Sequence, residues 1–214
     1  MTEFTDESRS IAAYLDALAS SAPTPGGGSV VGIVGALSAA LGQMVLNLTL
    51  GRDADDDALL DLITQLRQRQ QEMYEAGQAD EVAYASYRQA AELPRGNAAE
   101  KTARRQAMQA ALREATEIPL QIAQSAARTA ALFGQVAAVG NPHLRSDTAI
   151  GALLAEAALR GALLNVRGNA ELIKDEELAA SFLAAADHLE AGGRAAAQRA
   201  FVLVIGSTVA ADPA

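Results

Sequence analysis

The residues of this chain best suited to chemistry are a run of glycines and two aspartates. Gly26, Gly27 and Gly28 follow two prolines and precede Ser29. Consecutive glycines weaken a helix but allow the backbone to approach a ligand closely, and the N–H groups at a helix start favour an anion or a polarised oxygen. The segment therefore predicts either a ligand cradle or a tight turn where two helices or two subunits meet.

The two aspartates lie where acid–base or electrostatic roles are possible. Asp80 precedes Tyr84 by four residues, so both side chains share one helix face. Asp80 is also mid-helix, where burial would raise its pKa. Asp147 lies at a predicted helix start, where the helix dipole favours its ionised form. A solvated helix charge and a dipole partner are the simpler interpretations of these two residues.

Two asparagines interrupt an otherwise apolar helix. Asn165 and Asn169 are four residues apart, on one face. A buried amide needs hydrogen-bond partners. The pair predicts either contact with a ligand or an interface, or a polar link between helices. Lys101 and Arg104 lie near another helix start, where a solvated face is the simplest explanation.

The composition excludes several classes of protein. The 214 residues include 17 Lys and Arg against 26 Asp and Glu, a net charge of −9, with no Cys and two His. Thiolate chemistry, disulfides and His-rich metal sites are therefore excluded, and the acidic balance argues against nucleic-acid binding. Half of the residues are apolar but only 4% are aromatic, which favours close-packed helices over a sheet.

Start and stop signals predict one all-α domain over residues 1–214, a bundle of long helices. In the first half of the chain we expect helices over 4–18, from the cap Ser29 to Gly51, and from the acidic run 53–57 to Leu93. A fourth helix should begin at Ala98, with a kink or a new first turn at Pro119, and a fifth should run from the cap Ser146 through Val166. The next should begin at Asp175 and end at Gly192 and Gly193, followed by a last apolar helix.

Residues 30–50 carry no charge and are long enough to span a bilayer. Ser38, Gln43 and Asn47 interrupt this run, and no basic cluster flanks it. We interpret it as the buried helix of a cytoplasmic protein, with a membrane protein as the minor alternative. Its apolar and small residues exceed what a monomer should expose, so we expect a homodimer with this helix at or near the two-fold contact.

Eight short motifs follow one another along the chain, and together they resemble those of a known family. They are P-T-P-G-G-G-S, L-T-x-G, D-x-x-A-aromatic, L-P, E-K-x-x-R, x-P-L, G-N-x-x-x-x-S-D and N-V-x-x-N, ending at Asn169. By this ordered set the chain resembles the cyclodeaminase/cyclohydrolase family, most strongly over residues 10–178. That family comprises the C-terminal domain of formiminotransferase-cyclodeaminase and the stand-alone bacterial methenyltetrahydrofolate cyclohydrolases. The resemblance implies an all-helical dimer that binds folate in a cleft lined by the glycine-rich segment.

The resemblance also implies an activity, the hydrolysis of methenyltetrahydrofolate to formyltetrahydrofolate, with a tetrahydrofolate derivative as substrate and no metal. On this interpretation Asp80 handles protons and Asp147 stabilises the cationic substrate. Formiminotetrahydrofolate cyclodeaminase is the alternative enzyme, and a non-catalytic helical folate-binding or assembly protein is the alternative of another class. The candidate substrate-binding residues are Gly26, Gly27, Gly28, Ser29, Arg52, Lys101, Arg104, Asn141, Arg145, Asn165 and Asn169.

The chain departs from the family pattern at three positions. Family members commonly have Lys after L-T-x-G, where this chain has Arg52 and then an acidic run. Arginine keeps the positive charge but does not shuttle protons at neutral pH. Tyr84 replaces the usual Phe, and Gly168 replaces an apolar residue. The change at Arg52 leaves the non-catalytic alternative open.

Overall fold

The computed structural model describes residues 10–51 and 56–209, and all regular secondary structure in these ranges is helical. The predicted all-α class is therefore confirmed. A three-residue 3-10 turn, Pro142–Leu144, precedes the fifth helix. The helices are α1 (Ile11–Leu18), α2 (Gly27–Leu50), α3 (Asp57–Glu92), α4 (Ala98–Val139), α5 (Arg145–Ala170) and α6 (Glu176–Val209).

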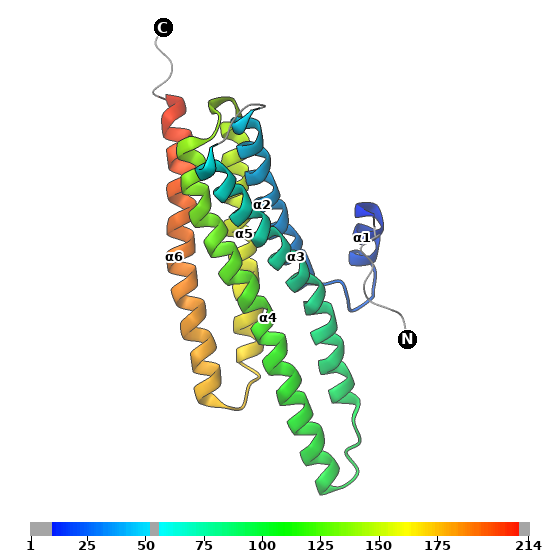
Figure 1. Cartoon of the computed structure of the whole chain (residues 1–214). Helices are drawn as coiled ribbons and strands as arrows, with labels where there is room; N and C mark the ends of the chain where they lie inside the picture. The colour runs from blue at the N-terminus through cyan, green and yellow to red at the C-terminus, as the bar shows by residue number, and fades with distance from the viewer. Residues whose placement is uncertain (1–9, 52–55, 210–214) are drawn as a thin grey trace.

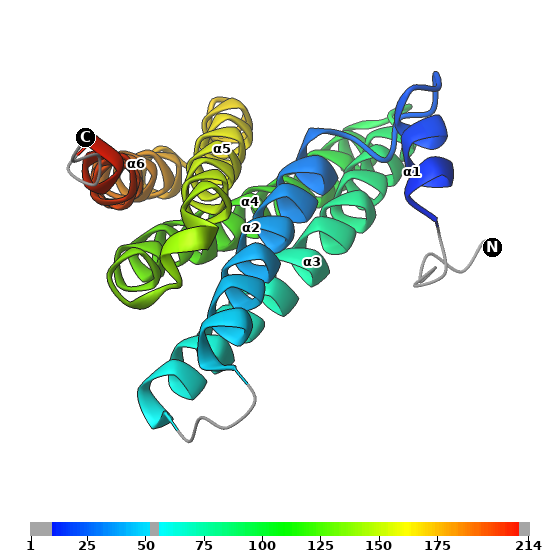
Figure 2. The ribbon, with the colours of Figure 1, turned by 90° about the horizontal axis from the view of Figure 1, so that it is seen from above.

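Four helices form a ring around one core. α2, α3, α4 and α5 each pack against two neighbours in the ring, and α6 packs against both α4 and α5. The long helices run side by side in Figure 1, and Figure 2 shows the same arrangement from above. The hairpin of α3 and α4 extends past the start of α2, whereas α1 stands outside the bundle in both views.

The backbones of α2 and α3 approach each other closely at two glycines. A Cβ atom at Gly32 would lie 2.6 Å from the Met73 carbonyl oxygen and 2.7 Å from the Gly77 Cα. A Cβ atom at Gly77 would lie 3.2 Å from the Ser29 carbonyl oxygen. Because neither glycine has a side chain, the two helices cross with their backbones in contact. The uncharged segment that raised the membrane question is therefore a packing surface within the bundle.

Two helices continue where the sequence predicted interruptions. α6 runs unbroken through Gly192 and Gly193, so the predicted separate last helix is wrong. A Cβ atom at Gly193 would lie 2.3 Å from the Leu159 Cδ2, so this glycine permits close packing against α5. α4 likewise continues through Pro119, which excludes a separate helix starting there. In both helices tertiary packing outweighs a local breaking signal.

Two predicted caps are also wrong. Gly26, not Ser29, is the N-cap of α2, and no side chain caps this end. Ser29 lies inside the first turn, because its hydroxyl group is bonded to tertiary partners described below. α5 begins at Arg145, before the expected cap Ser146, since the 3-10 turn leads directly into the helix. The predicted starts at Ala98 and beside Asp175 are confirmed.

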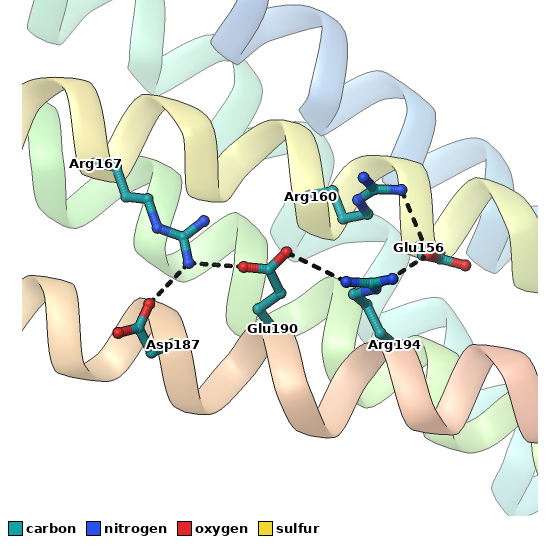
Figure 3. A network of polar contacts seen from close by, with 6 residues as sticks. All are labelled: Glu156, Arg160, Arg167, Asp187, Glu190 and Arg194. Atoms are coloured by element: carbon teal, nitrogen blue, oxygen red, sulfur yellow. Dashed lines mark hydrogen bonds and ion pairs between the residues drawn. The ribbon is translucent and has the colours of Figure 1, made fainter.

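Ion pairs join α6 to α5 along their exposed edge (Figure 3). Arg167 on α5 contacts Asp187 at 2.9 Å and Glu190 at 2.7 Å. Arg194 extends the series from Glu190, at 3.9 Å, to Glu156, at 3.7 Å. Exposed pairs contribute little individually. The packing of buried residues such as Phe182 and Ala200 therefore holds α6 in place.

Two helical segments, Gly27–Leu50 and Pro142–Ala170, are long and apolar enough to cross a membrane by length and composition alone. In the bundle they pack against each other. Within their most apolar stretches, 56% and 50% of the residues are buried, as expected for core helices.

A first prediction follows from the crossing of α2 and α3. Gly32→Ala should lower the free energy of unfolding by about 1–3 kcal/mol, because the added methyl group meets backbone that can move only if the helices separate. Gly134→Ala in α4 is the matched control, since a Cβ atom there meets nothing within 4 Å. This control should be stabilising by up to about 1 kcal/mol. Urea unfolding at one protein concentration measures the free energy of unfolding of both variants. Equal changes in the two variants would contradict the packing role of Gly32.

Candidate functional site

The glycine-rich start of α2 lies directly against Asp80. A Cβ atom at Gly28 would lie 2.1 Å from the Cγ and 2.1–2.2 Å from both carboxyl oxygens of Asp80. Gly28 is buried, and the helix end to which it belongs has no side-chain cap. The absence of a side chain at Gly28 is therefore what lets this carboxyl group occupy the N-terminus of α2. The structure thus brings together the glycine-rich segment and Asp80, which the sequence analysis treated separately.

Burial changes the acidity of this carboxyl group. Removal from water raises the pKa of Asp80 from 3.8 to about 6, and the negative charge of the adjacent Glu81 adds to the rise. The rise agrees with the expectation for a buried mid-helix Asp. A carboxyl group with a pKa of about 6 exists in both protonation states near neutral pH, which suits a general acid or base.

A chain of hydrogen bonds runs beside Asp80 and links three helices. The Tyr14 hydroxyl group of α1 donates to the Ser29 Oγ at 3.2 Å. Ser29 in turn donates to the Glu81 Oε1 at 2.9 Å. The serine is 3% exposed, so its hydroxyl group needs these partners. Through these bonds Ser29 connects α2 to α1 and α3, and its contact with substrate stays a prediction.

The two asparagines of α5 have different surroundings. Asn165 lies beside the glycine-rich segment, since a Cβ atom at Gly27 would be 3.9 Å from the Asn165 Oδ1. The Asn169 Nδ2 instead donates to the Ala115 carbonyl oxygen of α4 at 2.6 Å. That carbonyl group lies four residues before Pro119, which has no N–H to offer it. Asn169 therefore replaces the missing helical hydrogen bond and joins α5 to α4.

A second group of predicted residues lies at the opposite end of α2. The Asn141 backbone N–H donates to the Thr49 Oγ1, near the end of α2, at 2.9 Å. Arg145 and Asp147 follow in the first turn of α5. α2 has 24 residues, which corresponds to about 36 Å. Within one chain, Asp147 therefore does not meet Asp80.

The predicted cations are spread along the molecule. Lys101 and Arg104 lie on the outer part of the α3–α4 hairpin, where the Arg104 Nε donates to the Ala91 carbonyl oxygen at 2.9 Å. Ala91 is about 16 Å from Asp80 along α3. Arg52 lies outside the described residues. Lys101 and Arg104 are too far from Asp80 to share one small anionic group with it.

Sequence reasoning did not identify two participants in this site. Glu81 is next to Asp80 and receives the Ser29 hydrogen bond, but a single acidic residue on a helix carries no signal of its own. The Ala115 carbonyl group lacks its helical donor because Pro119, four residues later, has no N–H, and Asn169 takes that place. The unpaired carbonyl group could have been predicted from Pro119 alone. The partner itself is 54 residues away in sequence.

The arrangement defines a helical-bundle protein with a proton-exchanging carboxyl group at an uncapped helix start, next to neutral amide donors and acceptors. Among residues 10–51 and 56–209, no three His, Asp or Glu side chains gather as a metal site would require. Water activation or proton transfer by Asp80 is the chemistry that these side chains can perform.

Comparison with known proteins places the chain within a family. The model of the formiminotransferase-cyclodeaminase family matches residues 10–188, and the chain belongs to this family. Methenyltetrahydrofolate cyclohydrolase of Methylorubrum extorquens is 40% identical over 176 residues, 79% of this chain and 83% of the relative. Formimidoyltransferase-cyclodeaminase of Gallus gallus is 34% identical over 78% of this chain but only 31% of the relative.

A solved structure shares the whole fold. The crystal structure of formiminotetrahydrofolate cyclodeaminase from Thermotoga maritima aligns with a TM-score of 0.83 at 26% identity, covering 94% of this chain and 98% of that one. The chain therefore has the helical architecture of a folate one-carbon enzyme family, as the ordered motifs had indicated.

The second prediction tests the link between Asn169 and Pro119. Asn169→Ala should lower the free energy of unfolding by about 1–3 kcal/mol, because the Ala115 carbonyl group loses its donor. Pro119→Ala restores a backbone N–H four residues after Ala115, so the same Asn169 change should be less costly in that background. Urea unfolding of the four proteins gives the coupling free energy. An equal cost in both backgrounds would refute the proposed replacement.

Proposed function

We propose that this protein is a methenyltetrahydrofolate cyclohydrolase in which Asp80 handles the protons. The observation that supports this most strongly is the contact between the Asp80 carboxyl group and Gly28. It combines a raised pKa with the positive end of a helix dipole and with a helix start that no side chain caps. The 40% identity with the Methylorubrum cyclohydrolase supports the same substrate.

The reaction asks little of the protein, because the substrate carbon is already electrophilic. Water attacks the amidinium carbon that bridges two folate nitrogens, and ionised Asp80 accepts the water proton as the C–O bond forms. As one C–N bond of the tetrahedral intermediate breaks, the C=O bond forms and the hydroxyl proton is released to solvent, while Asp80 returns its proton to the leaving nitrogen. The carbon remains on the other nitrogen as a formyl group. The overall exchange adds one water to the cation and releases one proton.

The other predicted residues have binding roles in this proposal. The N–H groups of Gly26, Gly27 and Gly28 favour a polarised oxygen of the substrate. The Asn165 amide, beside Gly27, can both donate to and accept from a pterin edge. Lys101 and Arg104 are distant enough from Asp80 to meet the anionic glutamate tail of a bound folate rather than its reacting carbon.

Asp147 needs a second copy of the chain to join this site. The exposed faces of α2 and α5 carry large apolar side chains: Leu37, Met44, Leu48, Ile150, Leu153 and Leu164. Such a surface favours a homodimer. In a two-fold dimer whose axis is perpendicular to α2, the two α2 helices run antiparallel, so the end of one lies beside the start of the other. The partner subunit's Asn141, Arg145 and Asp147 would then face Asp80.

The family also supports a second candidate activity. The Thermotoga protein that shares the whole fold is a formiminotetrahydrofolate cyclodeaminase. In that reaction a folate nitrogen attacks the formimino carbon and ammonia leaves, so Asp80 would protonate the leaving amine. Assays with both substrates distinguish the two activities, and folate binding without turnover would support the non-catalytic alternative. Either enzyme fits the cytoplasmic location that we propose.

The third prediction concerns the role of Asp80. Asp80→Asn should reduce kcat on the order of a hundredfold or more with little change in KM, because proton transfer occurs only in the transition state. The measurement is the loss of methenyltetrahydrofolate absorbance, corrected for the buffer-catalysed rate. Asp61→Asn, at an exposed position on the same helix, is the control. Wild-type turnover in Asp80→Asn would overturn the assignment.

The fourth prediction tests whether Asp147 acts across the dimer. Asp147→Asn should weaken substrate binding as well as turnover, because a charge that stabilises the cation is lost. In a two-fold dimer, a mixed dimer of Asp80→Asn and Asp147→Asn chains keeps one site with both aspartates intact. Co-expressed chains should then recover about a quarter of the wild-type activity. No recovery, with mixed dimers isolated by two affinity tags, would contradict the shared site.

A further inference from the structure

The start of α2 meets two consecutive carboxyl groups of α3. Gly28 lies against Asp80. Ser29, the next residue of α2, donates its hydroxyl proton to the Glu81 Oε1 at 2.9 Å. The serine is buried and the glutamate is half-buried. The proposed function gives a role to Asp80, but it leaves the neighbouring carboxylate and its hydrogen bond without one.

Helix geometry makes the Ser29–Glu81 hydrogen bond informative. Consecutive side chains of a helix point in directions about 100° apart, so they do not face each other. α3 by itself therefore does not turn the Glu81 carboxylate toward Asp80. The hydrogen bond from Ser29 does so, because Ser29 follows Gly28, against which Asp80 lies. The Ser29 oxygen also accepts from the Tyr14 hydroxyl group, which leaves the single serine proton for the glutamate.

We propose that Glu81 is a positioning residue, whose carboxylate is held by Ser29 beside the start of α2 so that its negative charge makes Asp80 keep its proton more tightly. The proposal rests on the role assigned to Asp80 in the proposed function. It adds a residue that the ordered motifs leave open, because Glu81 is the first unspecified position of D-x-x-A-aromatic.

The surroundings of Asp80 leave this control to one charge. α2 has no charged residue between Gly27 and Leu50, and it presents the positive end of its dipole. α5 contributes the neutral amide of Asn165, and the phenol of Tyr84 follows one turn later on the same face of α3. Burial is the larger cause of the raised Asp80 pKa, and the charge of Glu81 is the second. No charge of α2, α4 or α5 within the described residues contributes to this rise.

This control matters for the chemistry proposed for Asp80. A carboxyl group that accepts a proton from water and then returns it to a leaving nitrogen works best when its pKa lies near the working pH. A like charge held nearby moves the pKa of an aspartate in that direction. Without the charge of Glu81, Asp80 would be a weaker base and would accept the water proton less readily. Glu81 thus acts through Asp80 and needs no contact with the substrate.

The experiment is a carboxyl titration of the substrate-free protein by NMR with ¹³C-labelled aspartate, in which Asp80→Asn identifies the Asp80 signal. Glu81→Gln keeps an oxygen that can accept from Ser29 but removes the charge. It should lower the Asp80 midpoint from about 6 by an amount on the order of half a pH unit. Ser29→Ala should lower the midpoint in the same direction, because the carboxylate is no longer held. In the Glu81→Gln background, Ser29→Ala should cause no further change.

A second serine–glutamate pair provides the matched control. Buried Ser125 of α4 donates to the Glu72 Oε2 of α3 at 2.6 Å, and Glu72 is about 12 Å from Asp80 along α3. Ser125→Ala removes the same kind of hydrogen bond and should leave the Asp80 midpoint at the wild-type value. An unchanged midpoint in Glu81→Gln would overturn the proposal. So would equal Ser29→Ala shifts with and without the Glu81 charge, because the serine would then act by packing alone.

Turnover gives a second, separate measurement. If Asp80 acts as a base, the acidic limb of kcat/KM has its midpoint near the Asp80 pKa. Glu81→Gln and Ser29→Ala should then both move this limb to lower pH, in parallel with the titration. A limb that stays in place while the NMR midpoint moves would overturn the catalytic part of the proposal. If the protein turns over neither folate, the proposed function fails, but the titration still decides whether Ser29 and Glu81 control Asp80.

Discussion

The contact between Gly32 and Gly77 is the constraint on which the candidate site depends. These glycines let the backbones of α2 and α3 touch. Gly28 lies one turn before Gly32 on α2, and Asp80 lies about one turn after Gly77 on α3. Because the two helices run antiparallel, Gly28 and Asp80 also lie against each other. A side chain at the crossing would separate the helices and admit water. The closeness of the helices is thus also the reason that burial raises the pKa of the carboxyl group.

This placement of Asp80 opposes stability at neutral pH. The folded state holds the Asp80 proton with a pKa of about 6, above the value of 3.8 for an unperturbed Asp. The stabilisation that comes from protonation is therefore fully present below about pH 3.8 and is lost as the pH rises through 6. Proton-exchanging groups in active sites commonly carry such a cost. The surrounding core, which includes fully buried Met73 and Leu163, offsets it.

A second structural link is the hydrogen bond that joins α5 to α4. Pro119 removes one hydrogen bond from α4, and Asn169 supplies the replacement from α5. This ties the end of α5 to α4, and Asn165, one turn earlier on α5, lies beside Gly27. The motifs x-P-L and N-V-x-x-N, which are 45 residues apart at their nearest ends, are therefore two halves of one interaction. Asn169 has a structural role in this arrangement, whereas Asn165 stays a candidate for substrate contact.

The sequence by itself determined the helical class, the starts of helices near Ala98 and Asp175, and the family, because composition, capping residues and ordered motifs are local properties of the chain. It could not determine that α6 continues through Gly193 or that Ser29 is a bridge rather than a cap. Those outcomes depend on which side chain of another helix lies within a few ångströms. Only the tertiary structure placed Asp80 at Gly28 and separated it from Asp147 by the length of α2, because helix crossing, not sequence spacing, decides which distant residues share a site.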